Sequence, residues 1–466
     1  MVTDARAAPL GRVRRDRIVG AALPLGLVAL ALALRLRGLD VPERMFFDEV
    51  YYADDARALL DRGVEEGFAV HPPVGKWLIG AGIAVVGFEP VGWRVAAAIA
   101  GTLTVLGAYA VGLRLLRSRW LAALAGLLVA VDGVALTMSR VAMLDGFVAM
   151  LVIGAAWLLL VERDGRHGAL DAPPWAHPAR WGAGALLGLG IATKWSAVLA
   201  LGAAGLVLIA WDLSDRRLRT GRWMPDPARF AAGLLLPLVV VPATIYVASY
   251  SGWFANYADT RPGSEACEAE PCAVPPQQRA VDWWREQGEI LRFHSDLDAD
   301  HPYRAPAWTW PVLTRPVVHY YESCAPDDPA EECAVAPGHG AIIVGVGNPA
   351  VWWLALPAYA LLGWAAIARR RADAGFLLAF LLGQWVPWLL AARPVFFFYT
   401  APLVPFVALA LAWASGEVAR HRRWRWAPVA VGTAAVVVAA YLYPVWVGTE
   451  LTDIGWRSRM LLRSWY

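Results

Sequence analysis

Long apolar segments separated by short charged connections are the feature that most constrains the fold of this chain. A run of about 20 apolar residues is long enough to cross the hydrocarbon core of a bilayer as a helix. Helices satisfy their own backbone hydrogen bonds in lipid, so this pattern predicts an all-α polytopic membrane protein. We expect about eleven spans, near residues 18–36, 93–113, 120–137, 145–161, 181–195, 197–211, 229–249, 349–368, 375–392, 395–415 and 427–447.

The composition agrees with a membrane protein. Of the 466 residues, 58% are hydrophobic and 17% are charged, and the mean hydropathy is +0.45, which argues against an ordinary soluble domain. The 25 tryptophans suit a protein with extensive membrane–water interfaces. The first apolar run lacks a small-residue cleavage site, so we expect it to be retained as the first span. We predict no nucleic-acid partner.

Arginine is concentrated in every second connection between the predicted spans. By the positive-inside rule, these connections face the cytoplasm. We therefore predict a plasma-membrane protein with a cytoplasmic N-terminal segment, 1–17, and an external C-terminal tail, 448–466. Segment 181–211 can instead form one re-entrant element, an alternative that the sequence leaves open. The basic residues are Arg12, Arg14, Arg15, Arg17, Arg114, Arg117, Arg119, Arg163, Arg166, Arg216, Arg217, Arg219, Arg222, Arg369, Arg370, Arg371, Arg420, Arg422, Arg423 and Arg425.

Two large segments fall on the predicted external face. Residues 37–92 lie within an N-terminal membrane module, 18–249, and residues 250–348 precede the last four spans, 349–447. All four cysteines lie in the second segment, which fits an oxidising compartment. The preferred disulfides join Cys267 to Cys272 and Cys324 to Cys333, although the sequence allows three connectivities. A zinc site is the alternative, but the spacings do not match the usual CxxC pattern.

Two adjacent carboxylates, Asp48 and Glu49, follow directly after the first predicted span. They lie among aromatic residues at the membrane surface, where a low dielectric disfavours a charged carboxylate that has no task. A carboxylate placed there can accept a proton from an attacking hydroxyl, and a second can orient it. The alternative without a function is that Asp48 and Glu49 are solvated carboxylates that end a helix or form an ion pair with a nearby arginine. Arg35 and Arg94 are both close to them in sequence.

Several basic residues gather on the same predicted face. Arg94, Arg140, Lys194 and Arg393 all fall at the external ends of spans, against the positive-inside tendency. We therefore expect an anionic group beside them, and a lipid phosphate is the natural candidate. For Arg140, a plain ion pair with Asp145 is an equally acceptable interpretation.

The remaining external motifs are less specific. His71 precedes two prolines and either caps the amphipathic stretch 75–87 or binds a metal ion, for which no partner residues can be placed. Lys76 either snorkels or binds an anionic head group. A run with helical spacing, 282–297, is either an interfacial aromatic anchor or a cover over a sugar or peptide cleft. It is followed by His301 and Tyr303.

Taken together and in order, these motifs resemble the protein O-mannosyltransferases, a family of GT-C type membrane glycosyltransferases. The resemblance covers most of the chain to about residue 316, and the external segment is too short for the extra β-trefoil-type module of eukaryotic members, which suggests a bacterial type. The matching pieces are Phe47-Asp48-Glu49-Val50, His71-Pro72-Pro73 with Lys76, Arg94, Ser139-Arg140 through Leu144-Asp145, Lys194-Trp195, Gly252-Trp253-Phe254, and His301-Pro302-Tyr303 through Trp310.

The resemblance implies transfer of mannose from polyprenyl-phosphate-mannose to a Ser or Thr hydroxyl of a translocating polypeptide, by a single inverting displacement. Asp48 would be the base, with Glu49 in support, and no metal or other cofactor is expected. The donor phosphate would be bound by Arg94 and Lys194, helped by Arg140 or Arg393. We assign sugar or acceptor contacts to Arg35, His71, Lys76, Asp145, Trp195, His301 and Tyr303.

Two other functions stay open at this point. Another GT-C transferase that acts on a lipid or glycan would share the acids of the first external segment. A secondary transporter would also have about eleven spans, but transporters usually carry their charges near the midplane and show an inverted repeat.

Overall fold

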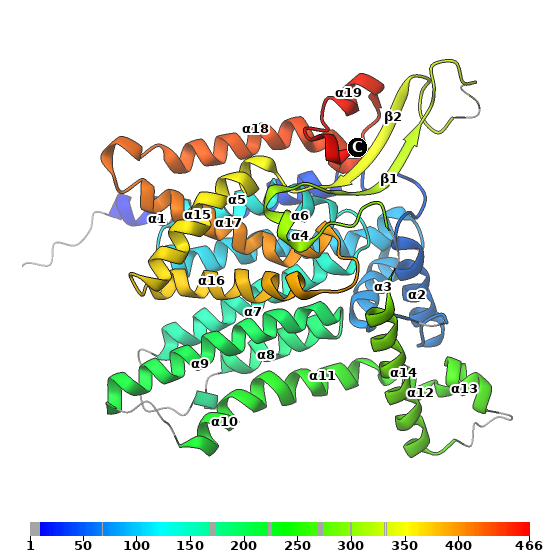
Figure 1. Ribbon diagram of the computed structural model, residues 1–466, viewed down its shortest axis with the longest axis horizontal. Helices are drawn as coiled ribbons and strands as arrows, with labels where there is room; N and C mark the ends of the chain where they lie inside the picture. Colours follow the sequence, from blue (N-terminus) through cyan, green and yellow to red (C-terminus); the bar gives the residue numbers. More distant parts are fainter. Residues whose placement is uncertain are drawn as a thin grey trace, which may run out of the picture.

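The computed structural model describes residues 10–67, 69–166, 174–176, 178–221, 226–267, 274–298, 301–329, 331 and 333–466. Helices dominate, and most of them run side by side in one bundle whose axis is horizontal in Figure 1. The bundle contains α1 (Leu10–Leu36), α4 (Pro90–Leu116), α5 (Arg119–Ala130), α6 (Gly133–Thr137), α7 (Leu144–Arg166), α8 (Pro178–Ile191), α9 (Val198–Thr220), α10 (Pro227–Leu235), a π-helical turn (Leu236–Val240), α11 (Val241–Ser249), α15 (Pro349–Ile367), α16 (Ala372–Trp385), α17 (Val404–Val418) and α18 (Ala427–Val447).

Within the described residues, nine helical segments are long and apolar enough to cross a membrane. They correspond to nine of the eleven predicted spans. The other two predicted spans are shorter helices of the same bundle: α5, which α6 continues after Asp132, and α8. The segment 181–211 forms two helices, α8 and α9, rather than one re-entrant element. The multi-span helical architecture expected from the sequence is therefore confirmed.

The centre of the bundle is built from small and apolar side chains. In the segment that contains α17, 94% of the residues in the most apolar stretch are buried inside the protein. Small residues let helix backbones approach closely, which is how helices associate in lipid. One buried polar network ties α7, α8 and α9 together, because Arg180 binds Glu162 at 2.7 Å and Asp212 at 2.9 Å. A membrane-embedded arginine is tolerated when it is paired in this way.

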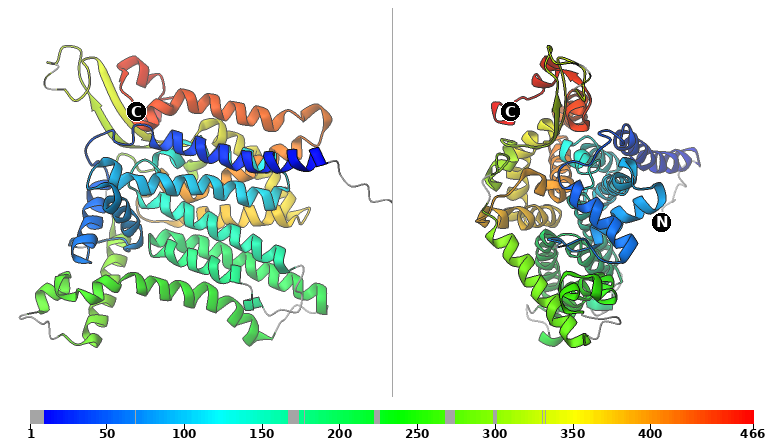
Figure 2. Two further views of the ribbon diagram at one scale, coloured as in Figure 1. Left: turned by 180° about the vertical axis from the view of Figure 1, so that it is seen from behind. Right: turned by 90° about the vertical axis from the view of Figure 1, so that its right-hand side faces the viewer.

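The segments between spans that the sequence placed outside gather at one end of the bundle, at the right of Figure 1. Helix α14 crosses this end nearly at right angles to the long helices (Figure 1 and Figure 2). This arrangement suits a helix that lies along a membrane surface. The helices at this end are α2 (Glu49–Arg62), α3 (Val74–Val86), α12 (Ser251–Ala255), α13 (Arg261–Ala266), α14 (Pro276–Asp296) and α19 (Asp453–Arg457).

A small antiparallel sheet also stands at this end, which the sequence analysis did not predict. Strand β1 (Val317–Ser323) pairs with β2 (His339–Gly345), which pairs with β3 (Leu451–Thr452) near the C-terminus. The disulfide Cys324–Cys333 closes the β1–β2 connection, as predicted, with a Cα–Cα distance of 5.6 Å. Cys267 is also disulfide-bonded, and its predicted partner Cys272 lies outside the described residues.

Short helical turns join the longer elements. They are η1 (Pro174–Ala176), η2 (Trp195–Ala197), η4 (Tyr257–Asp259), η5 (Ala307–Val312), η7 (Val386–Leu390), η8 (Phe397–Leu403), η9 (Arg422–Trp424) and η10 (Arg463–Trp465). Two of them, η2 and η8, carry aromatic and basic residues of the site described next.

Candidate active site

Asp48 occupies the N-cap position of α2 but does not cap the helix. Its side chain makes no hydrogen bond to the first amides of α2 within the described structure, although aspartate usually does so at this position. The side-chain contact that the carboxylate does make is long, at 3.4 Å from the Tyr52 hydroxyl to Oδ2. The carboxylate is therefore left with acceptor capacity for another proton donor.

The residue before Asp48 has an unusual backbone conformation. Phe47 has φ of +54°, a left-handed value that is uncommon for a bulky side chain. Its ring is held between His319 of β1 and Phe398 of η8, at centroid distances of 4.6 and 5.9 Å. Such conformations persist where surrounding packing determines them, and they are enriched at functional sites. The packing of Phe47 thereby fixes where the chain turns into α2.

Glu49 has a different role from its neighbour. It is fully buried, and its two carboxylate oxygens accept from Arg94 Nε at 2.8 Å and Arg94 Nη2 at 2.9 Å. The backbone N–H of Ala142 also donates to Glu49, at 2.9 Å. These contacts leave Glu49 poorly placed to accept a substrate proton, and they give it a structural task.

Arg94 uses all five of its N–H donors inside the protein. Besides Glu49, its guanidinium donates to the carbonyl oxygens of Leu39, Pro42 and Arg44, at 2.8–3.0 Å. A guanidinium has five N–H groups, so none remains for a phosphate. This geometry does not support the expected contact of Arg94 with the donor, and it assigns Arg94 to shaping the first external segment.

Arg140 also binds backbone rather than an exposed anion. Its guanidinium donates to the carbonyls of Arg35, Arg37 and Gly38 at 2.7–2.8 Å, at the C-terminal end of α1. Cations are favoured at helix C-termini, where carbonyls lack partners. Arg140 does not pair with Asp145, and its expected role as a phosphate ligand is not supported. Arg35 is itself fully buried in α1, away from any position for contact with an acceptor.

Lys194 and Asp145 form a buried ion pair at the end of the bundle. Lys194 Nζ lies 2.7 Å from Asp145 Oδ2, and both side chains are less than a tenth exposed. The ammonium also faces the ring of Tyr399 at 4.8 Å and that of Phe398 at 5.4 Å. An ammonium has three donors, so the contact with Asp145 leaves Lys194 capacity to bind an anion.

Arg393 reaches the same aromatic residues from the other side. Its Nη2 donates to the Tyr399 hydroxyl at 3.4 Å, and its Nη1 lies 3.3 Å from His294 Nδ1. The other nitrogen of His294, Nε2, lies 2.9 Å from the carbonyl oxygen of Val70. Tyr399 therefore lies between two cations, Lys194 and Arg393, and α14 supplies a histidine beside them.

His71 and Trp195 join this cluster. The ring of His71 stacks on that of His294, with centroids 5.2 Å apart, and lies 6.1 Å from the ring of Tyr52. Trp195 lies 6.0 Å from His294. The sequence assigned His71, Asp145, Lys194, Trp195 and Arg393 to one site, and the structure brings them together near Asp48.

Lys76 contacts this cluster through the backbone carbonyl of His71. It is buried, and its ammonium binds Asp55, Glu65 and the carbonyl oxygen of His71. These contacts tie α2 and α3 together and do not support a role in binding an anionic head group. Farther along the chain, His301 Nδ1 accepts from the Tyr303 amide at 3.2 Å. The His301 ring packs on Phe396 at 5.0 Å, so the His-Pro-Tyr motif lies behind the aromatic run that carries Tyr399.

The electrostatics single out Asp48. Burial raises the pKa of its carboxyl above the usual value, the Lys194 ammonium opposes that rise, and Asp145 adds to it. Burial also lowers the pKa of His71 and His294, and the neighbouring cations lower both further. Neutral imidazoles beside a carboxylate of raised pKa are typical of a site where a proton is exchanged.

An apolar groove of about 830 Å³ begins beside the cluster. It runs between α9, α11 and α14, and Trp195 lies at its edge with its Nε1 donating to the Tyr246 hydroxyl at 2.9 Å. Leu291, one turn before His294 on α14, also lines it. The groove therefore joins the polar cluster to the lipid-facing side of the bundle.

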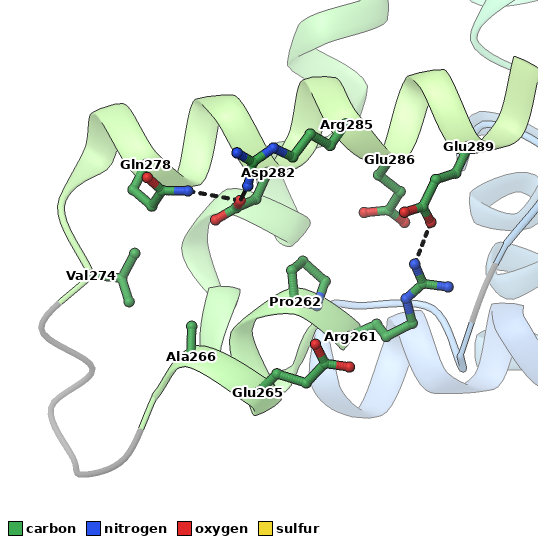
Figure 3. Close-up of a pocket in the computed structure, with 10 residues that line it drawn as sticks. All are labelled: Arg261, Pro262, Glu265, Ala266, Val274, Gln278, Asp282, Arg285, Glu286 and Glu289. Atoms are coloured by element: carbon green, nitrogen blue, oxygen red, sulfur yellow. Dashed lines mark hydrogen bonds and ion pairs between the residues drawn. The ribbon is translucent and has the colours of Figure 1, made fainter.

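A separate cavity of about 450 Å³ lies between α13 and the first half of α14 (Figure 3). Four carboxylates line it, and Asp282 accepts from Gln278 at 2.8 Å and from Arg285 at 3.2 Å. Asp282 precedes His294 by three helical turns, roughly 18 Å along α14. The residues that line this cavity include none of those that form the cluster around Asp48.

Some residues of the cluster were not assigned from the sequence. The sequence analysis assigned no role to Tyr52 or to Tyr399. His294 was noted in the helical run 282–297 but not placed at the site. The signal that would have identified it is its position at the C-terminal end of that helix. His319 was missed altogether, because its strand was not predicted.

Comparisons with known proteins identify the family of this chain. The family model described as dolichyl-phosphate-mannose-protein mannosyltransferase matches residues 89–257, and that of the C-terminal four-helix membrane region of protein O-mannosyltransferases matches residues 280–465. A polyprenol-phosphate-mannose–protein mannosyltransferase of Mycobacterium tuberculosis is 32% identical, over 100% of this chain and 94% of the relative. The chain belongs to the protein O-mannosyltransferase family.

Other relatives extend the match. A protein of the same description from Corynebacterium glutamicum is 30% identical over 90% of this chain and 88% of the relative. The Saccharomyces cerevisiae Pmt1–Pmt2 complex bound to its sugar donor gives a TM-score of 0.79 at 14% identity, covering 96% of this chain and 92% of the yeast chain. The mannosyltransferase thus has the GT-C membrane fold that the sequence resemblance implied.

Proposed function

We propose that this protein transfers mannose from polyprenyl-phosphate-mannose to Ser or Thr hydroxyls of protein acceptors. Family membership and the names of the relatives support the reaction class. Within the site, the proposal rests on the carboxylate of Asp48, which makes only a long hydrogen bond among the described residues and is influenced by the charge of Lys194. The neighbouring acid, Glu49, is paired with Arg94 instead.

In the proposed reaction, Asp48 removes the proton of the acceptor hydroxyl as its oxygen attacks the anomeric carbon of mannose. The bond between that carbon and the phosphate oxygen breaks, and its electron pair leaves with the polyprenyl phosphate. The attack comes from the face opposite the leaving group, so the configuration inverts. The raised pKa of Asp48 suits this role, because a general base works best when its pKa lies nearer the working pH.

Lys194 and Arg393 are the proposed ligands of the donor phosphate. Of the four cations that the sequence offered, these two retain donors that the protein does not use, whereas Arg94 and Arg140 bind carboxylate and backbone. Fixed cations stabilise the charge that develops on a departing phosphate. Tyr399, which contacts both, would keep them at a constant separation.

The apolar groove beside Trp195 is the proposed site of the polyprenyl chain. Its lining is aliphatic and aromatic, and it leads from the cations into the lipid-facing side of the bundle. A lipid-linked donor needs such a continuous path, because its phosphate must reach polar groups while its chain stays in an apolar medium.

The end of the bundle that carries Asp48 is the proposed extracytoplasmic face. The basic connections lie at the other end, which the positive-inside rule places in the cytoplasm of a plasma-membrane protein, together with the N-terminal segment. A site that faces outward would meet polypeptides that leave the translocation channel unfolded, and we propose such chains as acceptors.

A transfer assay with the purified full chain tests the reaction. Polyprenyl-phosphate-mannose carrying labelled mannose is supplied with a peptide rich in Thr, Ala and Pro, and with a matched peptide in which Ala replaces every Thr and Ser. We expect label only on the first peptide. Consumption of donor without labelling of either peptide would contradict a protein hydroxyl as acceptor.

A further inference from the structure

A further cavity, which is rich in arginine, lies at the end of the bundle opposite Asp48. It has a volume of about 450 Å³, and we call it the arginine pocket. Five arginines line it against two aspartates, and they come from the ends of α4, α7 and α17 and from the start of α16. They are Arg114, Arg117, Arg163, Arg371 and Arg420.

Aromatic rings form one side of the arginine pocket. Trp211 of α9 stacks on Phe376 of α16 with centroids 5.8 Å apart, and the guanidinium of Arg163 lies 4.5 Å from the Trp211 ring. The positive-inside rule accounts for positive charge on the cytoplasmic connections between spans. It does not require that arginines from several spans line one cavity with an aromatic wall. The convergence therefore calls for a ligand.

Carboxylates pair with Arg114, Arg371 and Arg420 of the pocket. Arg114 pairs with Asp164, Arg371 pairs with Asp373 at 2.5 Å, and Glu417 binds Arg371 at 2.7 Å and Arg420 at 3.2 Å. Among the described residues, Arg117 has no carboxylate partner, and its side chain stands at the exposed end of α4.

An apolar groove adjoins the pocket. It has a volume of about 950 Å³ and lies between α1, α5, α17 and α18, and we call it the α1–α18 groove. Arg420 lines both the groove and the arginine pocket. Gly26 of α1 and Gly432 of α18 line the groove, which runs along the lipid-exposed sides of these helices. A cationic hollow continuous with an apolar channel has the amphipathic character of a phospholipid.

We propose that the arginine pocket binds the phosphate head group of an anionic phospholipid and that the α1–α18 groove holds its acyl chains. Basic pockets between membrane helices recognise anionic head groups, and arginine suits phosphate because its N–H groups can bind two oxygens at once. The site lies in the leaflet opposite the one that presents the glycosyl donor to Asp48. It is separate from the transfer reaction.

Lipid binding to the purified full chain tests the proposal by native mass spectrometry. The probes are dioleoyl-phosphatidylglycerol, dioleoyl-phosphatidylcholine and glycerol phosphate, which offer the anionic lipid, a zwitterionic lipid and the head group without chains. We expect phosphatidylglycerol to bind more tightly than either of the others. Equal binding of the two lipids, or tighter binding of glycerol phosphate, would overturn the lipid site.

Two double variants distinguish lipid binding at the arginine pocket from general attraction of the lipid by positive charge. Arg117→Gln with Arg420→Gln removes two pocket cations, and we expect roughly thirtyfold weaker binding of phosphatidylglycerol, since each arginine near an anionic head group contributes about fivefold. The control, Arg422→Gln with Arg425→Gln, removes two exposed cations from the same end but outside the pocket. Equal weakening by both pairs would overturn the proposal.

The groove has its own matched pair. A Cβ atom added at Gly26 or at Gly20 meets no atom within 4 Å, so α1 tolerates a side chain at either position. Only Gly26 lines the groove. We expect Gly26→Trp to weaken phosphatidylglycerol binding while Gly20→Trp leaves it unchanged. Unchanged lipid binding in Gly26→Trp would show that the groove does not hold the chains.

Discussion

Arg94 and Glu49 form a buried pair in which two parallel hydrogen bonds, of 2.8 and 2.9 Å, join the guanidinium to the carboxylate. The pair gives the two adjacent acids of the first external segment different tasks. Glu49 anchors the start of α2 to α4, and Asp48 beside it keeps a carboxylate that the protein itself does not engage in a short hydrogen bond.

The first prediction concerns this pair. Arg94→Lys should destabilise the protein by about 3–5 kcal/mol, because a single ammonium cannot replace five directed donors and leaves Glu49 buried and incompletely paired. Thermal unfolding in detergent measures the loss. Arg57→Lys, an exposed arginine of α2 that forms a 3.7 Å pair with Asp61, is the control and should unfold like wild type. A stable Arg94→Lys variant with only a higher KM for donor would instead favour direct binding of phosphate.

A second prediction concerns Arg393. Arg393→Gln should raise the KM for polyprenyl-phosphate-mannose by roughly ten- to a hundredfold, because a hydrogen bond to a charged group contributes about 1.5–3 kcal/mol. The unfolding temperature should change little, since the hydrogen bonds of Arg393 within the described residues are both long, at 3.3 and 3.4 Å. Arg304→Gln removes an exposed cation from the same face and should leave the KM unchanged. Equal effects of the two substitutions would indicate general attraction of the donor rather than a site.

The third prediction concerns the pH dependence of transfer. Asp48 must be ionised to act as a base, so activity should fall as the pH drops through its raised pKa. The Lys194 ammonium lowers that pKa. Lys194→Gln should therefore move the acid limb of kcat/KM to higher pH, and Lys194→Arg, which keeps the charge, should keep the limb near its wild-type position. A limb that stays in place in Lys194→Gln would separate Lys194 from the ionisation of the base.

A fourth prediction concerns His319, which packs against Phe47. Burial lowers its pKa to about 3, whereas an unfolded chain holds histidine near its ordinary value of about 6.5. Between these values the unfolded state binds the extra proton, so this contribution to stability is present above about pH 6.5 and is lost as the pH falls toward 3. His319→Phe should remove that part of the acid sensitivity, measured as the unfolding temperature from pH 7 to pH 4. Parallel curves for the two proteins would contradict a buried neutral imidazole.

The sequence predicted the parts of the fold that follow from hydropathy and charge. The spans, the common end of the external segments and the Cys324–Cys333 disulfide could all be read from local patterns. The β1–β2 hairpin could not, because its strands follow no repeated pattern of the sequence, and β2 also pairs with β3 near the C-terminus. The sheet in turn brings His319 to Phe47, a contact between residues more than 250 positions apart.

The sequence predicted some residues of the candidate site, among them Lys194 and Arg393, but not what each residue contacts. The sequence placed Arg94 and Lys194 on the same external face and predicted that both bind the donor phosphate. Only the contacts distinguish the two residues. Every N–H group of Arg94 donates to Glu49 or to a backbone carbonyl, whereas Lys194 donates to one carboxylate, that of Asp145. His294 lies in the last turn of α14, and this helix crosses the end of the bundle (Figure 1), an orientation that the sequence does not reveal.

The most direct test of the account compares Asp48→Asn with wild type in the transfer assay. Asparagine keeps the shape of the side chain but cannot accept the proton, and general base catalysis typically contributes about 10²–10⁴-fold. We expect kcat to fall by at least that lower value, with unfolding temperature and donor binding unchanged. Asp61→Asn, an exposed acid on the same helix, should transfer mannose like wild type. Near-normal turnover by Asp48→Asn would contradict the assignment of the base.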